Sequence, residues 1–430
     1  MPNRQIPICT LIIVLIALSL EVSAQADLND FVKRSLVGNT VHMEYDHEAM
    51  IDSISALLTT TTALTDSITI LTDSISTLNL EIPNVSFTSL TNANIHEALE
   101  LWVSDELSAV STYGPIESWN TSAVTDMSSL FKNNGLFNEN ISSWDVSAVT
   151  NMRSMFQEAD AFNQNIGNWD VSAVTNMRSM FHEADAFDQY LGNWDVSAVT
   201  DMSSMFQEAD AFDQYLGNWD VSSVTNMFGM FHGADVFNQY IGNWNVSSVQ
   251  NMYQMFRQAG VFDQDIENWN TSSLTNMGQM FMKASAFNQD IGDWNVNSVT
   301  NMSRLFWDAD AFNGAIGNWD VGNVTHMVEM FAGADAFNQD IGNWNVSGVV
   351  SMKFMFLQAF DFNQNIGNWN VGNVTDMQGM FTGANEFNQD LGSWCVSNIT
   401  SEPSNFGNSG IDPVWGSCPD EDDGYPDANE

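Results

Sequence analysis

The chain has 430 residues and carries 54 acidic side chains (Asp and Glu) against 10 basic ones (Lys and Arg), which gives a formal net charge of -44. Hydrophobic residues make up 44% of the chain and aromatic residues 12%, and this content excludes a disordered acidic tail, which would lack aromatic residues. The scarcity of Lys and Arg argues against a nucleic-acid partner, because phosphate binding needs clustered bases.

Residues 1–26 have the parts of a secretory signal peptide. Arg4 provides a positive start, an apolar run extends from Ile6 to Leu20, and residues 22–26 offer small side chains for cleavage. The alternative is a membrane anchor, but the run is short for a span that needs roughly 20 residues. We therefore predict that this segment is removed, that the mature chain has no membrane insertion, and that the protein is secreted or exposed on the cell surface.

Residues 27–83 are predicted to form a helical stalk or coiled coil. From Ile54 to Ile82 apolar residues recur at alternating spacings of three and four, with isoleucine in one seam and leucine in the other, which is typical of a two-stranded coiled coil. The surrounding Ser and Thr residues are mediocre helix formers, so a single helix or a polar stalk is the alternative. A coiled coil over 54–82 would make the protein a homo-oligomer.

Residues 84–118 are predicted to hold an N-terminal cap helix. Apolar residues from Ile95 to Val110 fit one face of a helix that directly precedes the repeats. Terminal repeats need an atypical cover for their core, so we expect this helix to close the first repeat.

Tryptophan recurs every 25 residues over most of the chain, and this period falls in the leucine-rich-repeat range. Residues 119–406 hold eleven full repeats and a degenerate twelfth. Below, +n counts residues from the tryptophan that opens each repeat. The tryptophans are Trp119, Trp144, Trp169, Trp194, Trp219, Trp244, Trp269, Trp294, Trp319, Trp344, Trp369 and Trp394.

Within one repeat, apolar residues at +8, +11, +12 and +15 fit one face of a helix, with Thr175 as an N-cap in the repeat of Trp169. A short extended stretch follows. The sequence therefore predicts an α/β solenoid, leucine-rich-repeat-like, built of 25-residue strand-plus-short-helix repeats. Equivalent apolar residues would form ladders in a continuous core. The ladder residues include Trp169, Trp194, Trp219, Phe181, Phe206, Met177 and Met202.

The unit resembles the repeat of the BspA-like leucine-rich-repeat surface proteins, also described as the DUF285 repeat family. The similarity covers about 119–406 and is carried by segments such as VTNMRSMF at 149–156 and VTDMQGMF at 374–381. The resemblance implies a secreted or cell-surface protein with a leucine-rich-repeat-like solenoid and a role in adhesion to host proteins or other cells. It implies no catalytic residues.

The charges of the array are divided by position. All seven basic residues of the repeats fall between +9 and +14, whereas acidic residues recur at +1, +16 and +21. We therefore expect one strongly negative face, which favours cationic partners or bound cations. No cofactor is indicated, but hard oxygen ligands suit Ca²⁺, and the candidate ligands are Asp170, Asp195 and Asp220 at +1. A simple solvated acidic surface is the alternative.

The variable positions are where recognition is expected, because the constant ones form the core. At +21 the repeats carry Tyr190, Tyr215 and Tyr240, then Asp265 and Asp290, with Asp340 further along. Three successive tyrosines would stack into an exposed aromatic file, and packing of each ring on its neighbours is the alternative. We predict an adhesion-type protein that binds an extracellular protein or glycan through an extended acidic face. A structural surface or spacer protein without a specific ligand is the alternative, and no catalytic motif indicates an enzyme.

Residues 407–430 are predicted to form a C-terminal cap and an acidic tail. Cys395 and Cys418 remain after loss of the signal peptide, and a pair of cysteines in an oxidising compartment favours one disulfide. Two free thiols are the alternative.

Overall fold

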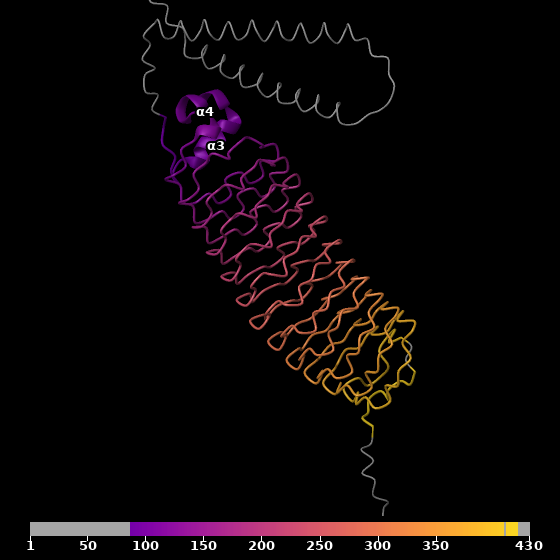
Figure 1. Cartoon of the computed structure of the whole chain (residues 1–430). Coiled ribbons are helices and arrows are strands. Elements are labelled where there is room, and N and C mark those ends of the chain that lie inside the picture. Colours follow the sequence, from indigo (N-terminus) through magenta and orange to yellow (C-terminus); the bar gives the residue numbers. More distant parts are fainter. Residues whose placement is uncertain (1–86, 408–409, 420–430) are drawn as a thin grey trace, which may run out of the picture. The chain divides into compact units, whose positions relative to one another are not determined.

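The computed structural model describes residues 87–407 and 410–419 (Figure 1). The chain divides into two units, 1–85 and 86–430, and every described residue belongs to the second. The predicted signal peptide (1–26), the stalk (27–83) and the acidic tail beyond residue 419 lie outside the described residues. In the described part, no helix is long and apolar enough to cross a membrane.

Two short helices and one turn of 3-10 helix precede the repeats: α3 (Ile95–Ser104), α4 (Glu106–Tyr113) and η1 (Ile116–Ser118). They close the first repeat. The Trp102 ring meets the Trp119 ring edge-on, with 6.2 Å between centroids. Asn92 Oδ1 accepts the backbone N–H of Thr125 at 2.8 Å, a bond that a preceding coil would otherwise supply. The cap therefore covers the apolar core at this end of the array and bonds to a backbone N–H group that would otherwise lack an acceptor.

The repeats form a stack of 25-residue coils, each hydrogen-bonded to the next (Figure 1). Parallel bridges join equivalent residues at +7, for example Asn151 with Asn176 and Asn176 with Asp201. Each bridge is a single pair of residues, so the extended segments are too short to count as β-strands. The chain is thus a repeat protein whose coils pair through backbone hydrogen bonds and not through a broad sheet.

The short helix predicted for each repeat does not form; within residues 119–407 this segment is a series of turns. The residues at +10 and +14 have positive φ in coil after coil, as at Ser154 (54°) and Glu158 (57°). This conformation interrupts a right-handed helix. Alternate N–H groups then point to the next coil: Ser154 N–H donates to Arg178 O at 2.8 Å. Thr175, the predicted N-cap, instead donates its N–H and its hydroxyl to the carbonyl of Thr150 in the preceding coil.

The predicted core ladders do form, because the apolar positions still point inward. The side chains at +8, +11, +12 and +18 are fully buried in the central coils. The centroid of the Phe206 ring lies 4.0 Å from that of Phe212 and 5.6 Å from that of Phe181 in the preceding coil. The Trp194 and Trp219 rings stack at 6.5 Å and 3°. The predicted ladder residues are all buried: Trp169, Trp194, Trp219, Phe181, Phe206, Met177 and Met202.

The tryptophan register also gives each buried indole N–H group a hydrogen-bond acceptor. The Trp219 indole N–H is buried and donates to the carbonyl of Leu191 at 3.0 Å. Leu191 lies three residues before Trp194, the tryptophan that opens the preceding coil. That carbonyl also accepts the backbone N–H of Trp194. The same indole bond recurs along the array, so each tryptophan joins two coils while filling the core.

Replacing Ser179 with glycine is expected to raise the free energy of unfolding by about 1 kcal/mol, because a side chain at φ 53° costs about 1–2 kcal/mol. Coils with Gly229 and Gly379 already use glycine at this position. Chemical denaturation would measure the change. Ser179→Val is the control and should lower stability, since β-branched residues tolerate positive φ poorly. A loss of stability with glycine would contradict this account.

Candidate binding surface

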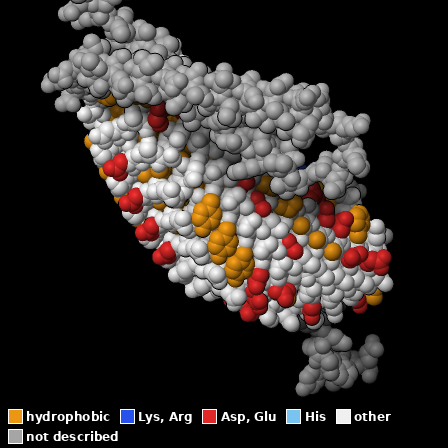
Figure 2. All heavy atoms as spheres, turned by 45° about the horizontal axis from the view of Figure 1, so that its top comes forward, with side chains coloured by type: hydrophobic (Ala, Val, Ile, Leu, Met, Phe, Trp, Pro, Cys, Tyr) orange, Lys and Arg blue, Asp and Glu red, His pale blue; other side chains and the backbone are white. Residues whose placement is uncertain are grey.

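The tyrosine row, which comprises Tyr190, Tyr215 and Tyr240 at +21, lies on the surface of three successive coils. Tyr190 is 43% exposed and Tyr240 is 37% exposed, and Tyr215 is half-buried. Figure 2 shows hydrophobic side chains in a diagonal line on a polar face, with acidic side chains beyond the line and no Lys or Arg visible among the described residues of that view. The structure therefore places the predicted aromatic positions at the surface.

The tyrosine rings do not stack on one another as predicted. Within the described residues no ring contact joins two of the three tyrosines. Each ring instead lies over the glycine two residues later in its own coil. A Cβ at Gly192 would stand 2.4 Å from the Tyr190 hydroxyl, and one at Gly217 would stand 2.5 Å from the Tyr215 hydroxyl. Glycine thus lets each ring lie against the backbone.

In most other coils the residue at +21 has a structural role that tyrosine cannot perform. Asn165 Oδ1 accepts the N–H of Gly167 at 3.0 Å, and Asn365 Oδ1 accepts the N–H of Gly367 at 3.0 Å. Asp340 and Asp390 make the same bond within their own coils. This is an Asx turn, in which a short polar side chain caps its own backbone. The three tyrosine coils replace that local bond with a ring that is exposed at Tyr190 and Tyr240 and half-buried at Tyr215.

The acidic hollow follows the tyrosine row along the same line of positions. It is an open depression of about 350 Å³ lined by the carboxylates of Asp265, Glu267 and Asp290, by Gly314, and by three amides. Gly314 stands where most coils have glutamine, and a Cβ there would meet the Gln289 carbonyl at 2.2 Å. The structure therefore brings Asp265 and Asp290 together. Asp340 is not among the residues that line the hollow. The three amides belong to Asn288, Gln289 and Asn313.

The aspartates at +1 are exposed and hold turns of their own. Asp195 Oδ1 accepts the N–H of Ser197 at 3.1 Å and its hydroxyl at 2.6 Å. These two hydrogen bonds lower the pKa of the Asp195 carboxyl below its usual value. Asp170 and Asp220 accept the equivalent backbone bonds from the serines two residues later. Among the described residues no group of three acidic, histidine or cysteine side chains is placed to hold a metal ion, and Ca²⁺ at this row stays a prediction.

A second acidic column lies at +16. Partial burial raises the pKa of Asp185 and Asp210, and the neighbouring carboxylates raise both further. For Asp210 the neighbours are Asp235 and Glu208. Like charges at equivalent positions of adjacent coils repel each other, and no local hydrogen bond is among the causes that act on these two carboxyls.

Replacing Asp210 with asparagine is expected to raise the melting temperature at pH 7, with a gain that shrinks as the pH falls toward 4. A carboxyl whose pKa is raised in the folded state binds protons more tightly there, so its contribution to stability falls as the pH rises through that window. The carboxyl is mostly solvated, so the gain is small, roughly 0.5 kcal/mol or less. Thermal unfolding followed by circular dichroism at both pH values would measure it.

Asp195→Asn is the matched control for this experiment. The folded-state pKa of Asp195 is lowered, so its ionised form contributes stability above the unfolded pKa and loses it as the pH falls through the folded pKa. The substitution should therefore give no gain at pH 7. Equal gains for the two variants would contradict the assignment of repulsion to the +16 column.

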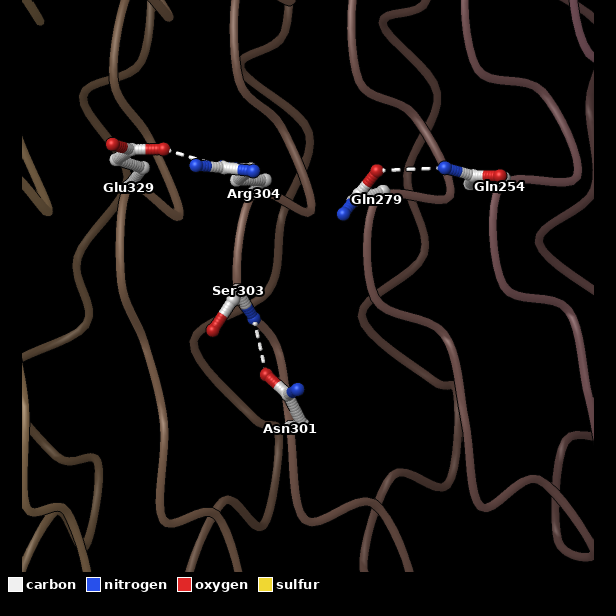
Figure 3. Close-up of polar contacts among 6 residues, drawn as sticks. All are labelled: Gln254, Gln279, Asn301, Ser303, Arg304 and Glu329. Atoms are coloured by element: carbon white, nitrogen blue, oxygen red, sulfur yellow. Dashed lines mark hydrogen bonds and ion pairs between the residues drawn. The ribbon is translucent and has the colours of Figure 1, made fainter.

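The basic residues belong to a different part of the coil, between +9 and +14, and several have partners there. Figure 3 shows Arg304 paired with Glu329 of the next coil, and Gln254 Nε2 donating to Gln279 Oε1 at 2.8 Å. The Arg304 guanidinium also lies 5.4 Å from the centre of the Trp307 ring. The Arg304–Glu329 and Gln254–Gln279 contacts join adjacent coils, whereas the Arg304–Trp307 contact lies within one coil, so this region carries both ionic and neutral polar bridges between coils.

Sequence reasoning missed the ladder formed by +19 and +20. In ten successive coil pairs the Asn or Asp at +19 accepts the N–H of the +19 residue in the next coil; Asn338 and Asn363 do so at 3.0 Å. The following glutamine often joins the same oxygen, as Gln364 does at 2.8 Å. The recurrent FNQ triplet was the available signal. It marks a structural ladder between coils.

Near the C-terminus the structure joins Cys395 and Cys418 in a disulfide. Trp415 packs edge-on against Phe406, with 4.9 Å between centroids, and Phe406 packs against Phe381 at 5.3 Å. This segment covers the last phenylalanine of the core ladder.

One family model matches three overlapping stretches of the chain, residues 103–218, 200–318 and 300–411. Its description is "Mycoplasma protein of unknown function, DUF285". The three matches together cover more than half of the chain. No curated protein matches this chain.

Proposed function

Because the chain belongs to the DUF285 repeat family, whose description states no function, we propose from its surface that it is an adhesion-type binding protein. It holds an extracellular protein or glycan along the face that carries the tyrosine row and the acidic hollow. The chain is secreted or displayed at the cell surface after loss of residues 1–26. It acts by binding and not by catalysis.

The observation that supports this proposal is the replacement of a structural residue by an exposed aromatic one. Asn165 and Asn365 cap their own coils, whereas Tyr190, Tyr215 and Tyr240 give up that bond on three consecutive coils. Aromatic side chains that are exposed together are enriched among residues that dominate binding energy.

The fold fits this role. A leucine-rich-repeat-like solenoid of the BspA-like type would present an extended surface made of equivalent positions on many coils. The acidic residues at +21 on this face favour partners with positive or neutral surfaces and disfavour anionic ones. The same charge gives the chain solubility despite its 44% hydrophobic content.

A binding panel would test the proposal. The full chain is immobilised and exposed to purified extracellular-matrix proteins and to a glycan array, in parallel with the variant Y190N/Y215N/Y240N. We expect at least one member to bind the natural chain and to lose binding to the variant. If no member binds, or if the variant binds equally well, the alternative of a structural spacer without a specific ligand gains support.

A further inference from the structure

We propose that the tyrosine row and the acidic hollow together form a binding site for a linear glycan of equatorially linked hexoses, either neutral or carrying amino groups. This inference rests on the proposed binding function and names its ligand class. The glycan runs along the axis of the array, with one sugar ring on each tyrosine coil and a polar end in the hollow.

The first argument is the match between ring faces and sugar faces. Each tyrosine lies against its own backbone over a glycine, so the opposite ring face is turned outward. The face of an aromatic ring is electron-rich. The axial C–H groups of an equatorially substituted hexose carry partial positive charge and form a flat apolar patch. Such a patch can stack on an exposed tyrosine ring.

The second argument is spacing. Equivalent aromatic rings of adjacent coils lie 6.1 Å apart at Phe187 and Phe212 and 6.4 Å apart at Trp219 and Trp244, measured between centroids. The tyrosine row therefore offers one ring per coil at short, regular intervals. A linear glycan can place its sugar rings along such a row one after another.

The third argument is the polar border of the tyrosine row. Exposed amides at +24 lie on one side, and the Tyr240 hydroxyl bonds to Asn243 Oδ1 at 3.3 Å. On the other side, Gln189 and Gln214 are held in place by bonds of 2.7 Å to the preceding coils. Amides both donate and accept hydrogen bonds, as sugar hydroxyls do. A few fixed polar groups beside an apolar platform are what orient a ligand.

The acidic hollow sets the charge of the ligand. Asp265, Glu267 and Asp290 are exposed around it, and no Lys or Arg is among the residues that line it. These carboxylates accept bonds from hydroxyl or ammonium groups and repel sulfates and uronates. The site therefore takes neutral or amino-bearing sugars and rejects anionic ones.

Isothermal titration of the full chain with soluble oligosaccharides tests this inference. The probes are cellohexaose, chitohexaose and the hexamer of glucosamine, each with its trimer. We expect at least one hexamer to bind, and to bind more tightly than its trimer, because a hexamer reaches from the tyrosines into the hollow. Y190N/Y215N/Y240N should weaken binding at least about tenfold, the equivalent of 1.4 kcal/mol.

The variants separate loss of contact from loss of fold. Asparagine already occupies the equivalent position at Asn165 and Asn365, where its side chain caps the turn. The triple variant should therefore keep or raise the melting temperature. Y190F/Y215F/Y240F keeps the ring faces and should keep most of the binding. Y253N changes a tyrosine at +9 that packs on Phe228, outside the site, and should leave the affinity unchanged.

The outcomes distinguish this inference from the proposed function. If no oligosaccharide binds but an extracellular protein does so through the three tyrosines, the glycan inference is overturned and the binding function stands. If neither sugars nor proteins bind, both are overturned. Equal binding of an oligosaccharide to the natural chain and to the triple variant would also overturn the site.

Discussion

Replacing Phe206 with alanine is expected to lower the free energy of unfolding by about 3–5 kcal/mol. The ring is fully buried and packs at 4.0 Å from Phe212, 5.6 Å from Phe181 and 5.8 Å from Phe231, measured between centroids. The four rings belong to three successive coils, because Phe206 and Phe212 share one, so the cavity would weaken two interfaces at once. Denaturant unfolding followed by tryptophan fluorescence would measure the loss.

Phe360→Ala is the matched control, because it makes the same chemical change at a surface position. Phe360 is 38% exposed, and its carbonyl still accepts the N–H of Glu386 after the side chain is removed. We expect a loss below about 1 kcal/mol, since surface substitutions have small effects. Similar losses for the two variants would show that the ladder does not hold the coils together.

The location of the loss is also informative. In a stack where each coil contacts only its neighbours, stability is a sum of coil and interface terms. A defect at Phe206 should divide the array into two blocks that unfold separately. Hydrogen exchange would then show early opening around coil 194–218, with slower exchange in the coils near residue 319.

Loss of the disulfide between Cys395 and Cys418 is expected to destabilise the C-terminal cap by about 2–4 kcal/mol. The bond closes a loop with a sequence separation of 23, and cross-links of this size remove chain entropy from the unfolded state. The double variant C395S/C418S should expose Trp415 and the end of the core ladder. Hydrogen exchange of Val396, whose N–H donates to Ser417 O at 2.9 Å, would report the opening.

The reductant provides the control for this prediction. The natural chain in dithiothreitol should behave like C395S/C418S, and the double variant should not respond to dithiothreitol. Coils near the N-terminal cap should keep their protection in every case, because coupling in the array extends mainly between neighbours. Unchanged protection at Val396 on reduction would contradict a structural role for the bond.

The core of this protein is readable from its sequence, and the backbone path is not. Residues such as Met177, Met180 and Phe181 recur at i, i+3 and i+4, and all are buried as expected. That spacing fits a helix, but it equally fits a chain of turns closed by i to i+3 bonds, such as Met180 N–H to Met177 O at 3.1 Å. The pattern alone cannot separate the two because both bring the same side chains to one face.

The positive φ positions show why local signals failed. Glycine normally marks the left-handed region, yet Ser179 and Glu183 adopt it at 53° and 54°. The next coil imposes this conformation, since Ser179 N–H must reach Ser203 O at 2.8 Å and Glu183 N–H must reach Gln207 O at 2.8 Å. Local preference is overruled by bonds to residues that lie 24 positions away in the chain.

For the candidate site too, the sequence predicted which residues take part but not how they are arranged. Its residues were predicted, including Tyr190, Tyr215, Tyr240, Asp265 and Asp290, because variable positions stand out against a constant register. Their arrangement was not predicted. The rings lie on their own glycines, and the acidic hollow depends on Gly314, which belongs to a different coil from the aspartates that line it.

The 25-residue register of tryptophans already establishes that this is a repeat protein, which side chains form the core, and that the acidic positions recur apart from the basic ones. These properties depend only on period and hydrophobicity. Whether each coil is a helix or a set of turns, and which polar side chains cap it, was decided by the stack. Backbone N–H groups that leave the coil find their acceptors only in the next one, as Phe206 does with Met230 O at 2.9 Å.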